Sequence, residues 1–322
     1  MIIISPDTEL PALLDITLSG VAGINSSLHL YGQNNDLITS SDNNPAGIGE
    51  EIMGIGITKP GSYYVMVTAK GYASSDQPYK IMYDLRKHNV SEEMEPNNNF
   101  NSANQFVQNH MKGRISSDGD RDFFLYRSGS GRKDFYRIEV RPPEAVDAKI
   151  SLYDKNRNLI ISLDNSGAGG NEVFPNFCST EDFFIVISAK HNQFSSNYYT
   201  LSVDQLDKPN TMETEPNDTK GKASPVNGGS ITGYTSYKKD IDYFLLEYDR
   251  RVKIEFVIEG VKDGEIKVSI TDPLGYILKS VTVKHNIQKN LTEFVDKKGY
   301  IIVESIRENY DNPYRIDLKS GN

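Results

Sequence analysis

The chain of 322 residues lacks several features on which common protein classes depend. Its only cysteine is Cys178, so no disulfide can form within the chain. It contains no tryptophan, which counts modestly against a lectin that stacks sugars on indole rings. No apolar run approaches the ~18 residues of a membrane-spanning helix, and the apolar start at residues 1–6 is too short for an export signal. We therefore expect no membrane insertion and no export signal within this chain.

Positive charge is in the minority. The chain has 35 Lys and Arg against 44 Asp and Glu, which gives a formal net charge of −9. Nucleic acids and anionic membranes bind to basic surfaces. The composition therefore predicts that nucleic acid is not a partner, and the excess of negative charge is typical of a soluble surface.

The sequence motifs of common catalytic sites are missing. The five histidines share no repeat position and no H-E-x-x-H spacing, and no G-x-S-x-G motif is present. Cys178 has no histidine beside it and is flanked by Phe174 and Phe177, which predicts an inert, partly buried thiol. The sequence therefore predicts a protein that is not an enzyme. The residues of a catalytic triad can come from segments far apart in the sequence, so a cryptic hydrolase is the less favoured alternative.

The glycine-rich segments predict turns. Gly47–Gly49 and Gly167–Gly170 follow Asp42–Asn43 and Asp164–Asn165, which are 122 residues apart. A phosphate-binding loop would have to follow a strand and open a helix, and neither segment does so. Tight turns between strands are the favoured interpretation.

The most informative feature present is a repeat of 120 residues. Glu93–Asn98 reads E-M-E-P-N-N, and Glu213–Asp218 reads E-T-E-P-N-D. Each is followed, at the same distance, by the acidic and aromatic motif D-x-D-[F/Y]-F, which begins at Asp120 and again at Asp240. A period this long indicates a whole domain copied in tandem, because solenoid units repeat every ~20–50 residues.

A third, shorter copy stands at the start of the chain. An aromatic-rich strand recurs in each copy, at residues 63–67, 183–187 and 300–303. Aligning Ile16 with Ile138 puts Ile2 opposite Phe124, so the first copy has neither the E-P-N segment nor the D-x-D motif. We therefore expect three domains, the first incomplete at its amino end, in a chain trimmed from a longer exported protein. Their predicted bounds are 1–88, 89–207 and 208–322.

Apolar and polar residues alternate within each copy, as at Leu14, Ile16 and Leu18. This pattern predicts antiparallel strands with one buried face, and short strands at such spacing predict sandwiches. Residues 101–107 alone predict a helical turn. We therefore expect an all-β chain of three tandem antiparallel β-sandwich domains, jelly-roll-like in architecture.

The repeated acidic residues predict a cation site. Glu95 precedes a proline, which favours extended backbone, so Glu93 and Asn97 point to the same face as Glu95. Asp120 and Asp122 likewise share one face of their strand. If the acidic segment folds back beside that strand, the carboxylates converge and repel one another unless a cation neutralises them. Oxygen ligands without His or Cys select Ca²⁺. A solvated acidic linker is the alternative.

These motifs together resemble the bacterial pre-peptidase C-terminal domain, and they are especially similar to the collagen-binding domains of secreted bacterial collagenases. The resemblance rests on E-P-N-[N/D], D-x-D-[F/Y]-F and the strand Gly61–Val67, and it covers nearly the whole chain. It implies an antiparallel β-sandwich that accompanies exported peptidases, is usually non-catalytic and binds calcium between the linker and an acidic strand. The calcium ligands it implies here are Glu93, Glu95, Asn97, Asn98, Asp120, Asp122, Glu213, Glu215, Asn217, Asp218, Asp240 and Asp242. The first copy lacks these residues, so no such site is expected there.

The same resemblance implies that a ligand docks on exposed aromatic residues of the sheet. Tyr63, Tyr64, Tyr198 and Tyr199 are the candidates, because adjacent residues of a strand point to opposite faces and one of each pair must point outward. The alternative is that the outward tyrosines only cover the sheet.

The sequence thus predicts calcium-stabilised, non-catalytic modules of a secreted or cell-surface bacterial protein. Their expected role is that of a binding or targeting accessory. The expected partners are an extracellular protein, a polysaccharide or a parent peptidase. A purely structural spacer between other domains is the alternative.

Overall fold

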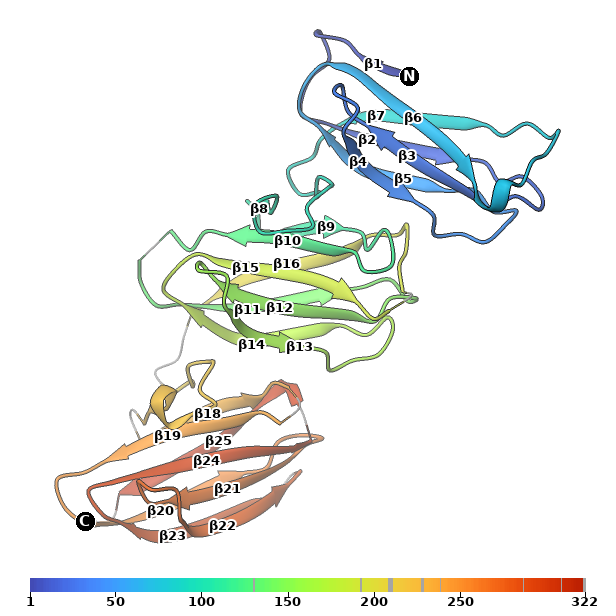
Figure 1. Ribbon diagram of the computed structural model, residues 1–322. Coiled ribbons are helices and arrows are strands. Elements are labelled where there is room, and N and C mark those ends of the chain that lie inside the picture. Colours follow the sequence, from blue (N-terminus) through green and yellow to red (C-terminus); the bar gives the residue numbers. More distant parts are fainter. Residues whose placement is uncertain are drawn as a thin grey trace.

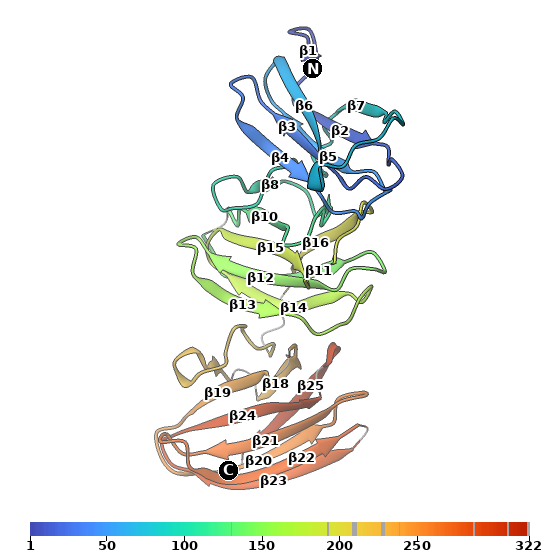
Figure 2. The same cartoon turned by 45° about the vertical axis from the view of Figure 1, so that its right-hand side comes forward.

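The computed structural model describes residues 1–129, 131–191, 193–207, 211–226, 229–237, 239–285, 287–307 and 309–320. It is all-β, with 56% of residues in strands, and its sheets are mainly antiparallel. The helical elements in the described ranges are two short 3₁₀ turns, η1 (Lys70–Tyr72) and η2 (Lys220–Lys222). Figures 1 and 2 show three groups of strands, here called the first, second and third unit, which follow one another from one end of the molecule to the other.

The first unit contains two sheets, with strand orders β1-β6-β3-β4 and β5-β2-β7. They enclose a core in which Leu14, Ile16 and Leu28 are completely buried. The alternation of apolar and polar residues along β2 directs its apolar side chains into this core. The strands are β1 (Ile2–Ile4), β2 (Ala12–Leu18), β3 (Ser26–Tyr31), β4 (Leu37–Ser41), β5 (Glu51–Ile57), β6 (Gly61–Ala69) and β7 (Ile81–Lys87).

The second unit has the same arrangement with two more strands. Its sheets have the orders β13-β12-β15-β10-β8 and β14-β11-β16-β9, and they enclose a core rich in aromatic side chains. The strands are β8 (Asn104–Phe106), β9 (His110–Gly113), β10 (Arg121–Tyr126), β11 (Asp134–Arg141), β12 (Ala148–Asp154), β13 (Leu159–Leu163), β14 (Glu172–Ser179), β15 (Phe183–Ala189) and β16 (Tyr199–Leu206).

The third unit repeats the second. Its sheets have the orders β17-β19-β24-β21-β22 and β18-β25-β20-β23, around a mainly aliphatic core. The strands are β17 (Ser224–Pro225), β18 (Ser230–Thr235), β19 (Ile241–Glu247), β20 (Val252–Glu259), β21 (Glu265–Thr271), β22 (Ile277–Lys284), β23 (Gln288–Val295), β24 (Lys298–Arg307) and β25 (Asn309–Ser320).

The all-β prediction is confirmed, but the helical turn predicted over residues 101–107 is wrong. This segment contains β8, which lies parallel to the neighbouring strand β10. The side chain of Asn104 exchanges hydrogen bonds with the backbone N–H and C=O of Met94, at 2.7 and 3.1 Å, and this pairing supports an extended backbone. β17 lies parallel to β19 in the same way, so each of these two sheets has one short parallel edge strand.

The start of the first unit also differs from the expected alignment. Ile2 pairs with Tyr63 on β6, which is the place that Tyr126 takes opposite Phe183 in the second unit. Ile2 therefore corresponds to Tyr126 and not to Phe124. The reason is that the connection to the next strand is two residues longer in the first unit. Ile2 lies 14 residues before Ile16 (16 − 2), whereas Tyr126 lies 12 residues before Ile138 (138 − 126).

The predicted bound at residue 88 falls just after β7, which ends at Lys87. The second bound falls after β16, which ends at Leu206, but Lys208 and the chain end at Asn322 lie outside the described residues. No helix in the described parts of the chain is long and apolar enough to cross a membrane.

Candidate metal centre

The first acidic segment lies between the first and second units and is hydrogen-bonded to both. Glu95 donates its N–H to Gly54 O (2.9 Å) and accepts from Gly56 N (2.8 Å), both on β5 of the first unit. On the other side, the N–H of Glu93 donates to Lys112 O (2.9 Å) on β9 of the second unit. The segment therefore forms single β-bridges with a sheet of each unit.

The second acidic segment repeats this arrangement between the second and third units. Glu215 pairs with Phe177 on β14, and its carbonyl accepts from Cys178 N at 3.1 Å. The N–H of Glu213 donates to Thr232 O (2.8 Å) on β18. The extended backbone that the sequence predicts from the E-P dipeptides places alternate side chains on one face, toward the strand that carries the D-x-D motif.

Three buried carboxylates meet beside the first segment. One oxygen from each of Glu93, Glu95 and Asp122 lies within 4.8 Å of the other two. Because Ca²⁺ binds oxygen at ~2.3–2.6 Å, oxygens on opposite sides of one ion are separated by about 5 Å. The three carboxylates, here called the first acid cluster, are therefore close enough to share one ion.

Hydrogen bonds hold the first acid cluster in place. The backbone N–H of Arg114 donates to Oε1 of Glu93 at 2.5 Å. The buried hydroxyl of Tyr199 donates to Oδ2 of Asp122 at 2.6 Å. Both oxygens of Glu93 are thus engaged, since its Oε2 accepts from the side-chain amide of Asn97 at 3.3 Å, whereas Glu95 and Asp122 each keep one oxygen without a partner.

The second acid cluster consists of Glu213, Glu215 and Asp242, whose oxygens lie within the same 4.8 Å limit. The hydroxyl oxygen of Tyr314 lies within hydrogen-bond distance of both Oε2 of Glu213 (2.9 Å) and Oδ2 of Asp242 (2.7 Å). Oε1 of Glu213 also accepts a 2.7 Å hydrogen bond from the side-chain amide of Asn176. Because Asn176 lies on β14, the second unit contributes directly to the acid cluster of the third.

Asp120 and Asp240 lie beside the clusters, each at the start of its acidic strand, and both are buried. Asp120 accepts hydrogen bonds from the N–H (2.7 Å) and hydroxyl (2.8 Å) of Ser116. Asp240 accepts from the N–H of Ser236 at 2.5 Å. Their charges act on the cluster carboxylates, whose pKa values are raised by burial and by these neighbouring aspartates.

The predicted residues Asn98 and Asp218 lie at the rim. Asn98 is exposed, and its side-chain amide lies 2.8 Å from Oδ1 of Asp120. Asp218 is half-buried and accepts a hydrogen bond from the hydroxyl of Tyr237. The two acid clusters therefore differ by one negative charge at this rim position.

Burial and mutual repulsion raise the pKa values of the carboxyls. Burial, followed by the negative charge of Asp120, raises the pKa of Glu95 to about 8. Burial raises the pKa of Glu213 to about 7, although four hydrogen bonds oppose this. Burial and neighbouring carboxylates raise the pKa well above its ordinary value for Glu93, Asp122, Glu215, Asp240 and Asp242. These groups therefore need protons or a cation near neutral pH.

Several buried oxygens of these sites have no hydrogen-bond partner. Among the described residues, fifteen buried side-chain polar atoms are unpartnered, and seven of them belong to these two sites. A buried oxygen without a hydrogen-bond partner costs folding free energy. The gathering of such oxygens at two repeated positions fits a bound ligand that supplies positive charge. The seven atoms are Oε1 of Glu95 and Glu215, Oδ1 of Asn97 and Asn217, and Oδ1 of Asp122, Asp240 and Asp242.

The four candidate ligand-binding tyrosines have different environments. Tyr63 and Tyr199 are buried, and Tyr199 is hydrogen-bonded to Asp122 of the first acid cluster, so neither can contact a ligand on the sheet surface. Tyr64 is exposed. Tyr198 is half-buried, and the guanidinium of Arg114 lies 3.6 Å from its ring centroid. Tyr64 is the member of the set with the most open face.

Sequence reasoning missed the asparagines that connect the units. Asn43 donates to Ser116 O (3.0 Å) and Asn165 to Ser236 O (2.7 Å), so the same contact joins each pair of neighbouring units. The two asparagines hold the same repeat position and were assigned only to turns. Asn176 had no repeated counterpart to mark it, since Gly54 occupies the corresponding position on β5.

Comparison with known proteins adds distant structural neighbours only. No family model and no curated protein match the sequence. A Eubacterium rectale protein thought to be secreted has a TM-score of 0.23 at 10% identity, over 65% of this chain and 72% of that one. The PBSX exported protein XepA has a TM-score of 0.24 at 11% identity, over 65% and 86% of the two chains. A triple jelly roll protein of an archaeal virus gives 0.23 at 12% identity, over 98% and 79%. Similarities this low carry no argument about function.

Proposed function

We propose that the protein is a tandem array of three β-sandwich domains that binds calcium at the two acid clusters and is not an enzyme. The observation that carries the proposal is the repeated convergence of three buried carboxylates, two of which have an unpartnered oxygen in each cluster. A structural acidic patch would not need to bury charges that repel one another.

Calcium is the cation that fits the donor set best. The donors are carboxylate and amide oxygens, with no histidine or cysteine in either cluster, which disfavours zinc and copper. Ca²⁺ accepts six to eight oxygens in irregular geometry, whereas Mg²⁺ requires a near-ideal octahedron. Glu93, Glu95 and Asp122 would hold the ion in the first cluster, and Glu213, Glu215 and Asp242 would hold it in the second. Asn97 and Asn217 each have an oxygen available.

The expected effect of calcium is to order the junctions between units. Each acidic segment is hydrogen-bonded to the unit before it and to the unit after it. An ion that neutralises the cluster therefore stabilises the segment and both contacts together. Binding to the folded form alone stabilises by about RT ln(1 + [L]/Kd), which is roughly 2.7 kcal/mol at a hundredfold excess over Kd.

For the protein as a whole, we propose an accessory role in a secreted or cell-surface bacterial protein. The modules would help a peptidase or a cell surface to hold an extracellular protein or polysaccharide. The support is the resemblance of the repeated motifs to pre-peptidase C-terminal domains, together with the exposed aromatic side chain of Tyr64. A binding panel over matrix proteins and polysaccharides, in calcium and in chelator, tests this role.

Calcium titration of the full chain by calorimetry tests the metal sites. We expect two binding events for the native chain and one for each single variant, Glu95→Gln and Glu215→Gln. Glu247→Gln is the matched control, because Glu247 is exposed and lies at the opposite end of β19 from Asp242. Absence of calcium binding in the native chain would end the proposal. Unchanged small-angle scattering with and without calcium would favour the alternative of a structural spacer.

A further inference from the structure

The first and second units enclose a cleft that is separate from the first acid cluster. Its volume is about 260 Å³. A cavity of about 150 Å³ holds a benzene molecule, and ligand pockets begin at roughly 300 Å³, so this cleft fits a ligand of about one or two amino-acid residues. Both units line it, the first with Ser41, Asn43, Asn44, Glu51 and Met53, and the second with Arg114, Ser116, Phe194, Ser195 and Ser196.

Arg114 presents a positive charge at a fixed place in this cleft. The residue is only 8% exposed. Its guanidinium carbon lies 3.6 Å from the ring centroid of Tyr198, and its Nε donates to Ser196 O at 2.8 Å. Its Nη1 lies 3.7 Å from the place that a Cβ atom at Gly54 of β5 would take. The guanidinium is therefore held within the second unit and lies against a strand of the first.

The contacts of this guanidinium leave its charge without a carboxylate partner. Among the described residues, Nη1 and Nη2 of Arg114 form no hydrogen bond or ion pair, and a carbonyl group and a ring face do not neutralise a cation. The carboxylates of the adjoining segment are engaged by other groups. Glu92 accepts two hydrogen bonds from Arg86, and Glu93 accepts from the backbone N–H of Arg114. The guanidinium can therefore donate to a carboxylate that a ligand brings.

The first unit supplies a negative charge and part of an apolar wall. Glu51 is exposed on β5, and its side chain forms no hydrogen bond or ion pair with any described residue. Met53, two residues further along β5, is half-buried, as is Phe194 of the second unit. One cleft thus combines a cation, an anion and apolar side chains.

The second junction does not repeat these charges. Register pairs place Val173 where the first junction has Glu51. Tyr234 takes the place of Arg114, because its backbone N–H donates to Glu213 as that of Arg114 donates to Glu93. The asparagine contact that joins neighbouring units is nevertheless present at both junctions. Joining two units therefore does not require the charged residues of the first junction.

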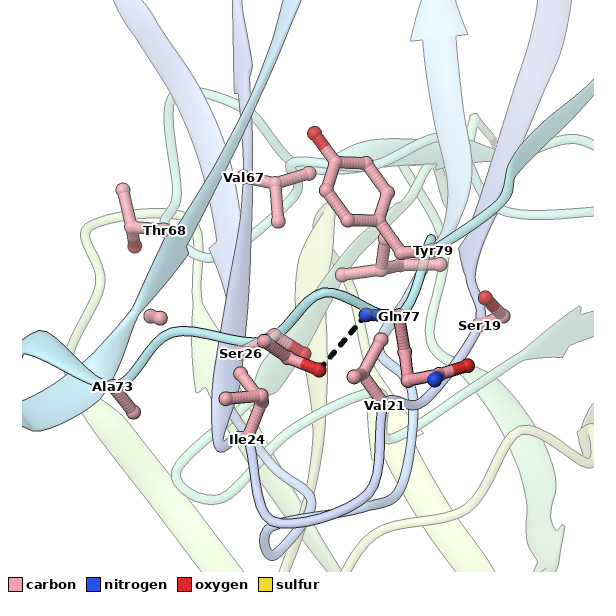
Figure 3. Close-up of a pocket in the computed structure, with 12 residues that line it drawn as sticks. Ser19, Val21, Ile24, Ser26, Val67, Thr68, Ala73, Gln77 and Tyr79 are labelled. Carbon is pink, nitrogen blue, oxygen red and sulfur yellow. Dashed lines mark hydrogen bonds between the residues drawn. The ribbon is translucent and has the colours of Figure 1, made fainter.

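A second cavity, of about 190 Å³ in the first unit, differs from this cleft in its chemistry. Its described lining residues, among them Val67, Gln77 and Tyr79, are all uncharged (Figure 3). It has no group that would fix the orientation of a charged ligand. The cleft between the units has two such groups of opposite sign.

We propose that the cleft between the first and second units binds a short zwitterionic peptide with an apolar side chain. The terminal carboxylate of the peptide accepts hydrogen bonds from Arg114, whose planar fork matches a carboxylate. Its terminal ammonium group lies at Glu51, and its apolar side chain packs against Met53 and Phe194. The cluster carboxylates take no part, so the site does not depend on the proposed calcium binding.

Titration of the full chain with the dipeptide Leu-Leu, followed by NMR, tests the proposal. We expect saturable one-to-one binding with a Kd of about 1 mM or below, in chelator as well as in calcium. N-acetyl-Leu-Leu lacks the ammonium group and Leu-Leu amide lacks the carboxylate. Each should bind at least about tenfold more weakly, because one charged group of the cleft loses its partner. Equal binding of the three compounds, or no saturable binding of Leu-Leu, would overturn the proposal.

Two variants assign the ends of the peptide. Arg114→Gln should abolish the preference for Leu-Leu over its amide and keep the preference over the acetylated form. Glu51→Gln should do the reverse, and because Glu51 is exposed this variant tests the site without disturbing the fold. Glu247→Gln, at an exposed position of the third unit, is the matched control and should keep both preferences. Retention of both preferences in Glu51→Gln would contradict the proposal.

Discussion

The side-chain amide of Asn176 lies 2.7 Å from Oε1 of Glu213, so a strand of the second unit holds a carboxylate of the third unit's acid cluster. The first junction has no counterpart of this contact, because Gly54 occupies the place of Asn176. The two junctions therefore share their backbone pairing and differ in side-chain coupling.

The substitution Asn176→Leu should weaken the second junction. It removes the donor from a buried carboxylate oxygen, which leaves Glu213 Oε1 with only the N–H of Tyr234. Loss of one partner of a buried charge costs about 1–3 kcal/mol. Urea denaturation should show this loss, together with weaker calcium binding at the second cluster. Asn156→Ala at an exposed turn is the control and should leave both quantities unchanged.

The stability of the metal-free protein should fall as the pH rises. The pKa values of Glu95 (about 8) and Glu213 (about 7) are above the ordinary value, so protons stabilise the folded state. This contribution is complete below about pH 4.5 and is lost as the pH rises through about 7–8. In chelator, Tm should therefore drop by roughly 5 °C or more between pH 5 and pH 9.

Calcium should remove most of that pH dependence, because the ion replaces the protons. Calorimetry in buffers of different ionisation enthalpy should show proton release when calcium binds near pH 7. A Tm in chelator that rises between pH 5 and pH 9 would contradict the charge arrangement described for the clusters.

The second acid cluster should bind calcium more tightly than the first. It has Asp218 at its rim, where the first has Asn98. Burial raises the pKa of Glu93, and the positive charge of Arg114 partly opposes this, so the first cluster also has a competing cation. Because calcium affinity grows with the number of charged ligands, the difference should be roughly tenfold. Two-site calorimetry measures it directly.

Exchange of the two rim residues tests the cause of this difference. Asp218→Asn should weaken the second site, and Asn98→Asp should strengthen the first, so that the double variant reverses or abolishes the order. Equal affinities in the native chain, or an order that the exchange leaves unchanged, would show that the rim charge does not control binding.

Gly113→Ala should destabilise the second unit. The added methyl group would overlap the hydroxyl of Tyr199 and lie 2.5 Å from Oε2 of Glu93. Overpacking of this kind costs about 1–3 kcal/mol, and it should also disrupt calcium binding at the first cluster. Gly167→Ala is the matched control, because nothing lies within 4 Å of the methyl group that it would introduce. Thermal denaturation of both variants provides the comparison.

The fold and the acid clusters could be predicted because their determinants are local and repeated. Alternation along β2 and β11 specifies strands with one buried face, and the E-P dipeptides specify extended segments. The 120-residue spacing then points to the same carboxylates twice. Glu93, Glu95 and Asp122 meet as the sequence predicts, as do their counterparts one repeat later.

What could not be predicted depends on contacts between distant segments. Tyr199 was expected at a ligand-binding surface, but it is buried and hydrogen-bonded to Asp122, 77 residues away in sequence. A tyrosine recurs at this repeat position, at Tyr79, Tyr199 and Tyr314, but the sequence does not show which residue it contacts. Similarly, Asn104 extends a segment that its local sequence alone assigns to a helical turn, because its side chain pairs with the backbone of Met94.

The pairing of each acidic segment with two sheets has a mechanical consequence. A pulling force applied along the chain must pass through the backbone hydrogen bonds around Glu95 and Glu215 before it reaches the interior of the next sandwich. These few bonds should yield first, and the load needed to break them should rise if the proposed calcium ion holds the carboxylates beside them. Under the proposed function, the array would then be a tether whose compliance depends on the calcium concentration of its surroundings.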